Sequence, residues 1–82
     1  MIYTLFFEKT ENTGLYYKRK INGKRIHTNL LHTTFLCTLP RQGEIINFDS
    51  IYNNYYKVIV VEYYISETET YSQILLEKLK GD

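Results

Sequence analysis

The chain has 82 residues, enough for one small domain and too few for two, so we expect a single domain over residues 1–82. Hydrophobic residues make up 44% and aromatic residues 16% of the chain, which excludes an intrinsically disordered protein and predicts a packed core. The formal net charge of +1 is well below the strongly basic balance of dedicated nucleic-acid binders.

The charge is unevenly divided along the chain. Residues 1–41 hold seven Lys and Arg against two Glu, whereas residues 42–82 hold three Lys against seven carboxylates. This asymmetry predicts a dipolar molecule, which can present a basic face to an anion or meet its own copies head to tail.

Cysteine usage and hydropathy bear on the compartment. Cys37 is the single cysteine, so no internal disulfide can form. The chain shows neither a secretory signal nor an apolar run of about 18 residues, and we expect a cytoplasmic protein with no membrane contact. The absence of Ala and the abundance of Ile, Tyr, Asn and Lys match AT-rich codons, which suggests a low-GC bacterium or its phage.

The first predicted strand is IYTLFFEK, residues 2–9, and it is apolar on both alternating faces. Such a strand belongs in the middle of a barrel, a sandwich or an oligomer seam. The polar segment TENTG then turns the chain.

A long hairpin follows, in which LYYKRKI and KRIHTNLL flank Asn22-Gly23, the dipeptide typical of a two-residue type I′ turn. This turn sets Ile21 opposite Lys24 and gives one largely apolar face. On the other face Lys20 lies opposite Arg25, a like-charge pair that is mildly destabilising and needs a reason. The residues of that face are Tyr16, Lys18, Lys20, Arg25, His27 and Asn29.

The second half of the chain alternates turns and strands. An extended segment runs to Pro40, PRQGE is a turn, and residues 55–65 form the longest strand candidate, which we expect at the centre of the sheet. SETET is the next connection. Residues 71–80 fit a strand or a helix, and the short SETET loop favours a strand in a hairpin. The prediction is an all-β fold, a small antiparallel curled sheet or barrel with a long N-terminal β-hairpin, or α+β if this last segment is helical.

The stretch LPRQGEIINFDSIYNNYYKVIVVEY resembles the small β-barrel proteins, SH3-like in outline, of bacterial mobile elements and phages. The resemblance implies a curled antiparallel sheet and a non-catalytic role as an adaptor, a nucleic-acid binder or an inhibitor of host defence. The chain departs from that outline because a hairpin region of some forty residues precedes the stretch.

Catalytic and metal-binding patterns are missing from the sequence. His27 and His32 are five residues apart, which in a regular strand puts them on opposite faces, and Cys37 lies five further on. Glu67 and Glu69 fall in a solvated connection, and the isolated glycines fit turns rather than a phosphate loop. We expect no enzyme, no catalytic residue, no metal and no cofactor.

The basic hairpin is the first candidate site. We expect it to contact phosphates or an acidic protein surface, with stacking or hydrogen bonds from neighbouring rings. The alternative is a solvated face whose charges discourage edge-to-edge aggregation. The candidate anion-binding residues are Lys18, Arg19, Lys20, Lys24, Arg25 and His27.

Three tyrosine pairs form the second candidate, Tyr16-Tyr17, Tyr55-Tyr56 and Tyr63-Tyr64. In a strand each pair places one ring inward and one outward, and exposed tyrosines are frequent in protein interfaces. The alternative is a set of rings at the rim of the core. The candidate interface residues are Tyr16, Tyr55 and Tyr63.

Two functions follow. The first is a non-catalytic phage or mobile-element binding protein that holds nucleic acid or an acidic protein surface on its basic hairpin and interferes with a host system. The second is a homo-oligomeric interaction or inhibitor module that uses its tyrosine-rich sheet and encloses a small anionic ligand.

Overall fold

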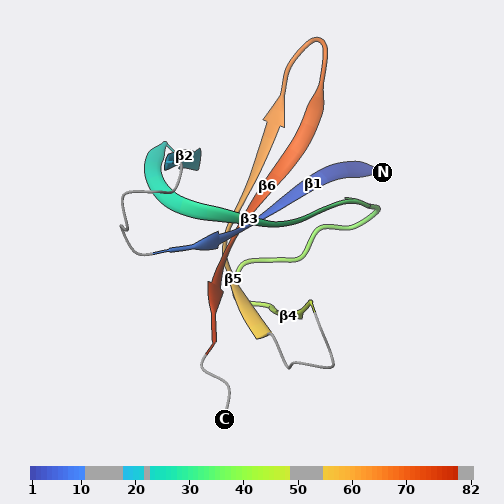
Figure 1. The fold of residues 1–82 in the computed structure, drawn as a ribbon. Coiled ribbons are helices and arrows are strands. Elements are labelled where there is room, and N and C mark those ends of the chain that lie inside the picture. The colour runs from blue at the N-terminus through green and yellow to red at the C-terminus, as the bar shows by residue number, and fades with distance from the viewer. Residues whose placement is uncertain (11–17, 22, 49–54, 80–82) are drawn as a thin grey trace.

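The computed structural model describes residues 1–10, 18–21, 23–48 and 55–79, leaving aside the side chains of Lys18 and Arg19. Six strands form one sheet in the order β2-β3-β1-β6-β5-β4 (Figure 1). They are β1 (Ile2–Lys9), β2 (Lys18–Ile21), β3 (Lys24–Leu36), β4 (Ile45–Asn47), β5 (Tyr55–Ile65) and β6 (Thr70–Lys78). The all-β prediction is confirmed, and the ambiguous last segment is a strand. The described residues contain no helix that could cross a membrane.

The centre of the sheet is a parallel pair, β1 and β6, while every other neighbouring pair is antiparallel. The sheet is therefore mixed, and it is open because β2 and β4 form its two edges rather than closing into a barrel. The prediction that residues 55–65 form the central strand is wrong, because β6 separates β5 from β1.

The burial of β6 explains its central place. Five consecutive residues, Ser72 to Leu76, are buried, so both faces of the strand are covered. β1 is likewise buried on both sides at Phe6 and Phe7, which confirms that residues 2–9 lie in the middle of the fold. Strands without a solvated face are typical of central, parallel positions.

Two β-bulges interrupt the regular pairing. In β3, His32 pairs with Phe6 and Leu30 pairs with Phe7, so Leu31 between them is the extra residue. In β5 the pairing steps from Val58 to Val60 in the same way, which leaves Ile59. The two bulges lie at nearly the same level of the sheet. Phe6 and Phe7, opposite the first bulge, pair with Ile74 and Leu75, and the second bulge lies opposite Leu75 and Leu76. Bulges increase local twist and bend the strand, and β3 follows a curved path in Figure 1.

Each face of the sheet has its own hydrophobic cluster. The Phe6 face buries Phe6, Tyr56, Val58, Ile74 and Leu76, and partly buried side chains of residues 39–48 pack against it. The opposite surface, which we call the Phe7 face, buries Phe7, Leu75 and Ile21. Since Ile21 belongs to the β2–β3 hairpin, that hairpin covers one end of the Phe7 face.

The hairpin has the register that the Asn-Gly turn predicted. Ile21 pairs with Lys24, and Lys20 pairs with Arg25. Gly23 has a φ of 79°, which the type I′ turn requires and which a residue with a side chain adopts at a cost. Ile21 is fully buried, so the apolar face of the hairpin points to the core. The hairpin residues before Lys18, which include Tyr16 of the predicted polar face, fall outside the described residues.

The β5–β6 turn is held by the Ser66 side chain. Its Oγ accepts hydrogen bonds from the amides of Thr68 at 3.3 Å and Glu69 at 3.1 Å, and the Ser66 amide donates to the Glu69 carbonyl at 2.9 Å. These bonds set the register of the hairpin, which extends past the neighbouring strands in Figure 1.

Candidate functional site

Four aromatic residues form a row across the Phe7 face, one on each of four adjacent strands. Tyr3 of β1 pairs with Phe35 of β3 on one side and with Tyr71 of β6 on the other, and Tyr71 pairs with Tyr64 of β5. At a strand spacing of about 4.8 Å the row spans roughly 14 Å. Phe35, Tyr3 and Tyr64 are exposed, so the row is a surface feature.

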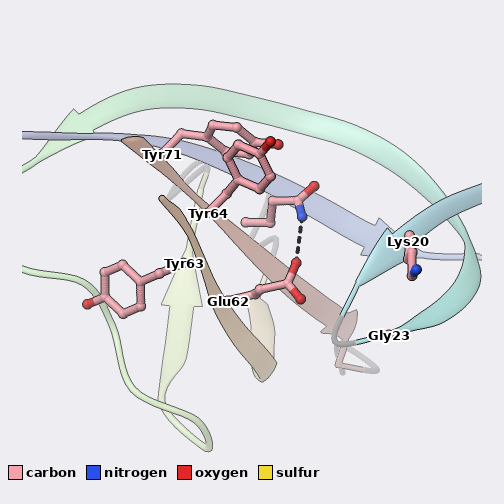
Figure 2. Close-up of a pocket in the computed structure, with 7 residues that line it drawn as sticks. Lys20, Gly23, Glu62, Tyr63, Tyr64 and Tyr71 are labelled. Atoms are coloured by element: carbon pink, nitrogen blue, oxygen red, sulfur yellow. Dashed lines mark hydrogen bonds between the residues drawn. The ribbon is translucent and has the colours of Figure 1, made fainter. Parts of the chain in front are cut away.

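The rings of this aromatic row contact each other in two pairs. The Tyr64 and Tyr71 rings are stacked, with centroids 4.8 Å apart and planes inclined by 23°, as Figure 2 shows. The Tyr3 and Phe35 rings are tilted by 51° with centroids 5.1 Å apart. Neighbouring rings restrict each other's rotamers, so the row is preorganised for a flat ligand.

The next register row toward the hairpin is more polar. Gln73 lies opposite Glu62, and its Nε2 donates a hydrogen bond of 2.7 Å to Glu62 Oε1. Gln73 is only 5% exposed, while Glu62 is partly exposed. In Figure 2 the Glu62 carboxylate lies between the stacked tyrosines and the hairpin.

The β2–β3 hairpin borders the other side of this surface. Lys20 and Gly23 of the hairpin line an open groove of about 490 Å³ together with residues of β5 and β6. Its further lining residues are Glu62, Tyr63, Tyr64, Tyr71 and Gln73. Ile21 holds the hairpin in place by packing against Phe7 and Leu75. The groove therefore joins the basic hairpin to part of the aromatic row.

The predicted anion-binding residues lie on or near this hairpin. Lys20, Lys24 and Arg25 are exposed, and His27 is half-buried. In the backbone register Lys18 pairs with His27, and Arg19 with Ile26. Of this set, Lys20 lines the groove.

The predicted interface tyrosines do not gather at one place. Tyr16 lies outside the described residues. Tyr55 and Tyr63 are exposed, at 39% and 54%, but the bulge at Ile59 reverses the alternation between them and puts them on opposite faces of β5. The rule of one inward and one outward ring holds for Tyr55-Tyr56.

The same rule is wrong for Tyr63-Tyr64, where both rings are exposed. The two residues point to opposite sides of β5, as Figure 2 shows. Both sides are accessible because this end of the β5–β6 hairpin is open to solvent, and residues 63–70 are all exposed.

Sequence reasoning missed the aromatic row and the Glu62–Gln73 pair. The pairing of Tyr64 with Tyr71 could have been found, because a four-residue connection from Ser66 to Glu69 sets that register. The addition of Tyr3 and Phe35 depends on the parallel β1–β6 pair, for which no local signal exists.

The two histidines also differ from expectation. The bulge at Leu31 reverses the alternation, so His27 and His32 share a side of β3 rather than lying on opposite faces. The two histidines still do not form one site. His27 lies in the β2–β3 hairpin, whereas the His32 ring lies beside Phe48, with ring centroids 5.9 Å apart. Within the described ranges, no group of three His, Cys, Asp or Glu is placed to hold a metal ion.

No protein-family model, curated protein or solved structure significantly matches this chain. The resemblance of residues 39–63 to SH3-like phage proteins therefore stays a prediction.

Proposed function

We propose that the protein is a non-catalytic binder of single-stranded nucleic acid, which it holds in the groove between the basic hairpin and the aromatic row. The observation that carries this proposal is the stacked pair Tyr64–Tyr71 in a groove that Lys20 also lines. Aromatic side chains that stack bases, beside cations that meet the backbone, are the two elements of single-strand binding sites.

The aromatic half and the cationic half of the site have different tasks. Bases stack on the exposed rings, since every base has a π face, and each such contact is worth about 1–3 kcal/mol. Phosphates lie toward Lys20, which lines the groove, and toward Arg25, which pairs with Lys20 across β2 and β3. In a duplex the base faces are covered by their neighbours, so the site prefers single strands.

The like-charge pair of the hairpin has a reason under this proposal. Lys20 and Arg25 face each other directly across β2 and β3, which costs a few tenths of a kcal/mol or more in the free protein. A phosphate between or near the two cations removes that repulsion and releases bound counterions.

A direct test measures the binding of labelled single- and double-stranded oligonucleotides by fluorescence anisotropy. We expect single-strand binding that weakens roughly 5- to 100-fold in Tyr64→Ala, because one stacking contact is lost. Tyr55→Ala is the matched control, since Tyr55 is an exposed tyrosine that does not line the groove. Equal loss in both variants, or no binding by the parent protein, would overturn the proposal.

A salt titration tests the cationic half separately. Each phosphate contact contributes about 0.7 to the slope of log K against log salt for a single strand. We expect the double variant Lys20→Glu/Arg25→Glu to lower that slope by about 1 or more. Lys57→Glu, at an exposed lysine of β5 outside the groove, should lower it much less.

A protein interface is the second candidate, because Phe35 is 58% exposed in the same aromatic row. Large exposed aromatic side chains are typical of interface centres. Light scattering on the same samples separates the two functions. A stable dimer that Tyr64→Ala dissociates, together with no oligonucleotide binding, would favour a homo-oligomeric module.

A further inference from the structure

We infer that the open edge of β5 pairs with the same edge of a second copy of this chain, so that two sheets join into one in a closed dimer. The inference does not depend on the proposed nucleic-acid binding. It starts from the lengths of two strands, because β5 has eleven residues and β4 pairs with only the first three of them. The backbone of Val58 still bonds to Gly43 and Glu44. Beyond Val58, the described part of the chain places no strand on this side of β5.

Three residues of this open edge direct their backbone N–H and C=O groups away from β6. The Ser66 amide donates to the Glu69 carbonyl at 2.9 Å, so the backbone of Ser66 faces β6. Alternation in an antiparallel pair gives Tyr64 and Glu62 the same direction and turns the residues between them outward. A row of outward backbone groups is a template for a further strand. The outward residues are Val61, Tyr63 and Ile65.

The side chains of this edge lack the usual protection against strand pairing. Tyr63 is 54% and Ile65 74% exposed, and Val61 is half-buried. In Figure 2, Tyr63 points to the side of β5 opposite to Tyr64. Natural sheets often protect an edge with lysine or proline, and the segment 61–65 contains neither. Edge strand β2, in contrast, has the sequence KRKI.

A second copy of the same edge fits this template. Antiparallel pairing about a two-fold axis at Tyr63 sets Tyr63 opposite itself and Val61 opposite Ile65. The outward groups of both copies then pair in about six hydrogen bonds. The side-chain pairs are aromatic with aromatic and β-branched with β-branched, which favours pairing, and no like charges lie directly opposite each other. Because each copy uses the same edge, the dimer closes and does not grow into a fibre.

Charge supports the same register. Continued past Ile65, the register sets Glu67 in the turn of the second copy opposite Ile59. Beside this part of β5 lies an open groove of about 460 Å³, which Val61 and Tyr63 line together with Arg41. Arg41 and Glu67 are both exposed. The acidic turn of each copy therefore comes near a cation of the other, and this attraction occurs twice in a two-fold dimer.

The experiment exchanges charges at Tyr63 and measures association of the free protein by light scattering over a dilution series. Because residue 63 faces itself, Tyr63→Lys brings two ammonium groups together and Tyr63→Glu brings two carboxylates together. We expect a dimeric parent, and each variant should raise the dimer dissociation constant about 10-fold or more. An equimolar mixture of the two variants should associate again, since lysine then faces glutamate. Tyr55→Lys, at an exposed tyrosine that pairs with β4, should leave the constant unchanged.

Four results would overturn the inference. A parent that is monomeric at every concentration would leave the edge to an extended segment of a different protein. A dimer that Phe35→Lys dissociates and Tyr63→Lys does not would use the exposed aromatic row instead. A mixture that fails to associate would show that residue 63 does not face itself. Ile65→Pro removes one outward N–H and is the independent variant should the charged ones not fold, so an unchanged dimer in Ile65→Pro is the fourth.

Oligonucleotide binding is measured separately on the same samples. A protein that forms this dimer and binds no oligonucleotide would contradict the proposed function alone. A monomer that binds single strands would contradict the edge pairing alone.

Discussion

Ser72 Oγ donates a hydrogen bond of 3.0 Å to Thr4 Oγ1 across the parallel β1–β6 pair, and both residues are fully buried. Thr4 Oγ1 in turn donates to the Ile2 carbonyl oxygen at 3.0 Å. The two hydroxyls thus satisfy each other inside the Phe6 face of the sheet. A slip of one residue would bury them without these partners, so the bond favours the observed register over its neighbours.

We expect Thr4→Val to lower the free energy of unfolding by about 1–3 kcal/mol, because the Ser72 hydroxyl then loses its acceptor while it stays buried. The double variant Thr4→Val/Ser72→Ala should be more stable than Thr4→Val alone, since it removes both polar groups together. Urea unfolding of the parent and the variants measures this. Additive losses in the double variant would show that the hydroxyls are not coupled.

Ile21 anchors the basic hairpin, because it is fully buried against Phe7 and Leu75. We expect Ile21→Ala to cost about 2–5 kcal/mol of stability, from lost burial and the cavity left behind. Ile45→Ala is the control, since Ile45 is 54% exposed and should cost much less. Similar losses in chemical denaturation would mean that the hairpin is not held by this contact.

Gly43 has a φ of 92°, and its amide donates a hydrogen bond of 2.8 Å to the Val58 carbonyl oxygen, next to edge strand β4. A Cβ at this position would meet no atom within 4 Å, so the cost of a side chain is conformational. We expect Gly43→Ala to destabilise the protein by about 1–2 kcal/mol.

The asparagine variant is the control for this position. Gly43→Asn should lose less stability than Gly43→Ala, because asparagine tolerates positive φ better than other residues with a side chain. Thermal unfolding compares the two. Equal stability of Gly43→Ala and the parent protein would show that the turn relaxes to another conformation.

Burial raises the pKa of the Tyr56 hydroxyl above its ordinary value of 10.0, and the negative charge of Glu8 and its hydrogen bond with Tyr56 act in the same direction. The folded protein therefore binds the Tyr56 proton more tightly than the unfolded chain does. This contribution to stability is complete below pH 10.0 and is lost as the pH rises from there through the folded pKa.

Tyr56→Phe tests this dependence, since phenylalanine keeps the ring and has no proton to lose. We expect the variant to lose less stability than the parent between neutral and strongly alkaline pH. Tyr55→Phe, at an exposed neighbour, is the control. Denaturation at a series of pH values measures the difference, and parallel alkaline slopes in Tyr56→Phe and the parent would contradict the expectation.

Local features of the sequence predicted much of the fold. Alternation and β-branched residues placed the strands, the Asn22-Gly23 dipeptide set the pairing of Lys20 with Arg25, and Gly43 marked a turn. Each of these signals acts over a few residues, where backbone geometry and side-chain type are sufficient. The hairpin formed by residues 55–65 and 70–78 followed from the short SETET connection in the same way.

The composition of the aromatic row could not be predicted to the same extent. Tyr64 and Tyr71 belong to one hairpin, but Tyr3 joins them through a parallel pairing between strands more than sixty residues apart in the chain. No short-range signal encodes such a pairing, because it is decided by which strands can bury both of their faces together.

Strand identity, the hairpin register and the cationic character of the hairpin were thus determined by the sequence itself, since each depends on neighbours along the chain. Tertiary structure alone decided that β1 and β6 are central and parallel. It also decided that bulges at Leu31 and Ile59 reverse the alternation of their strands, and that the hairpin folds beside an aromatic row. The physical reason is that a single extra residue in a strand moves every later side chain of that strand to the opposite face of the sheet. Only the packing of the whole sheet selects where that extra residue lies.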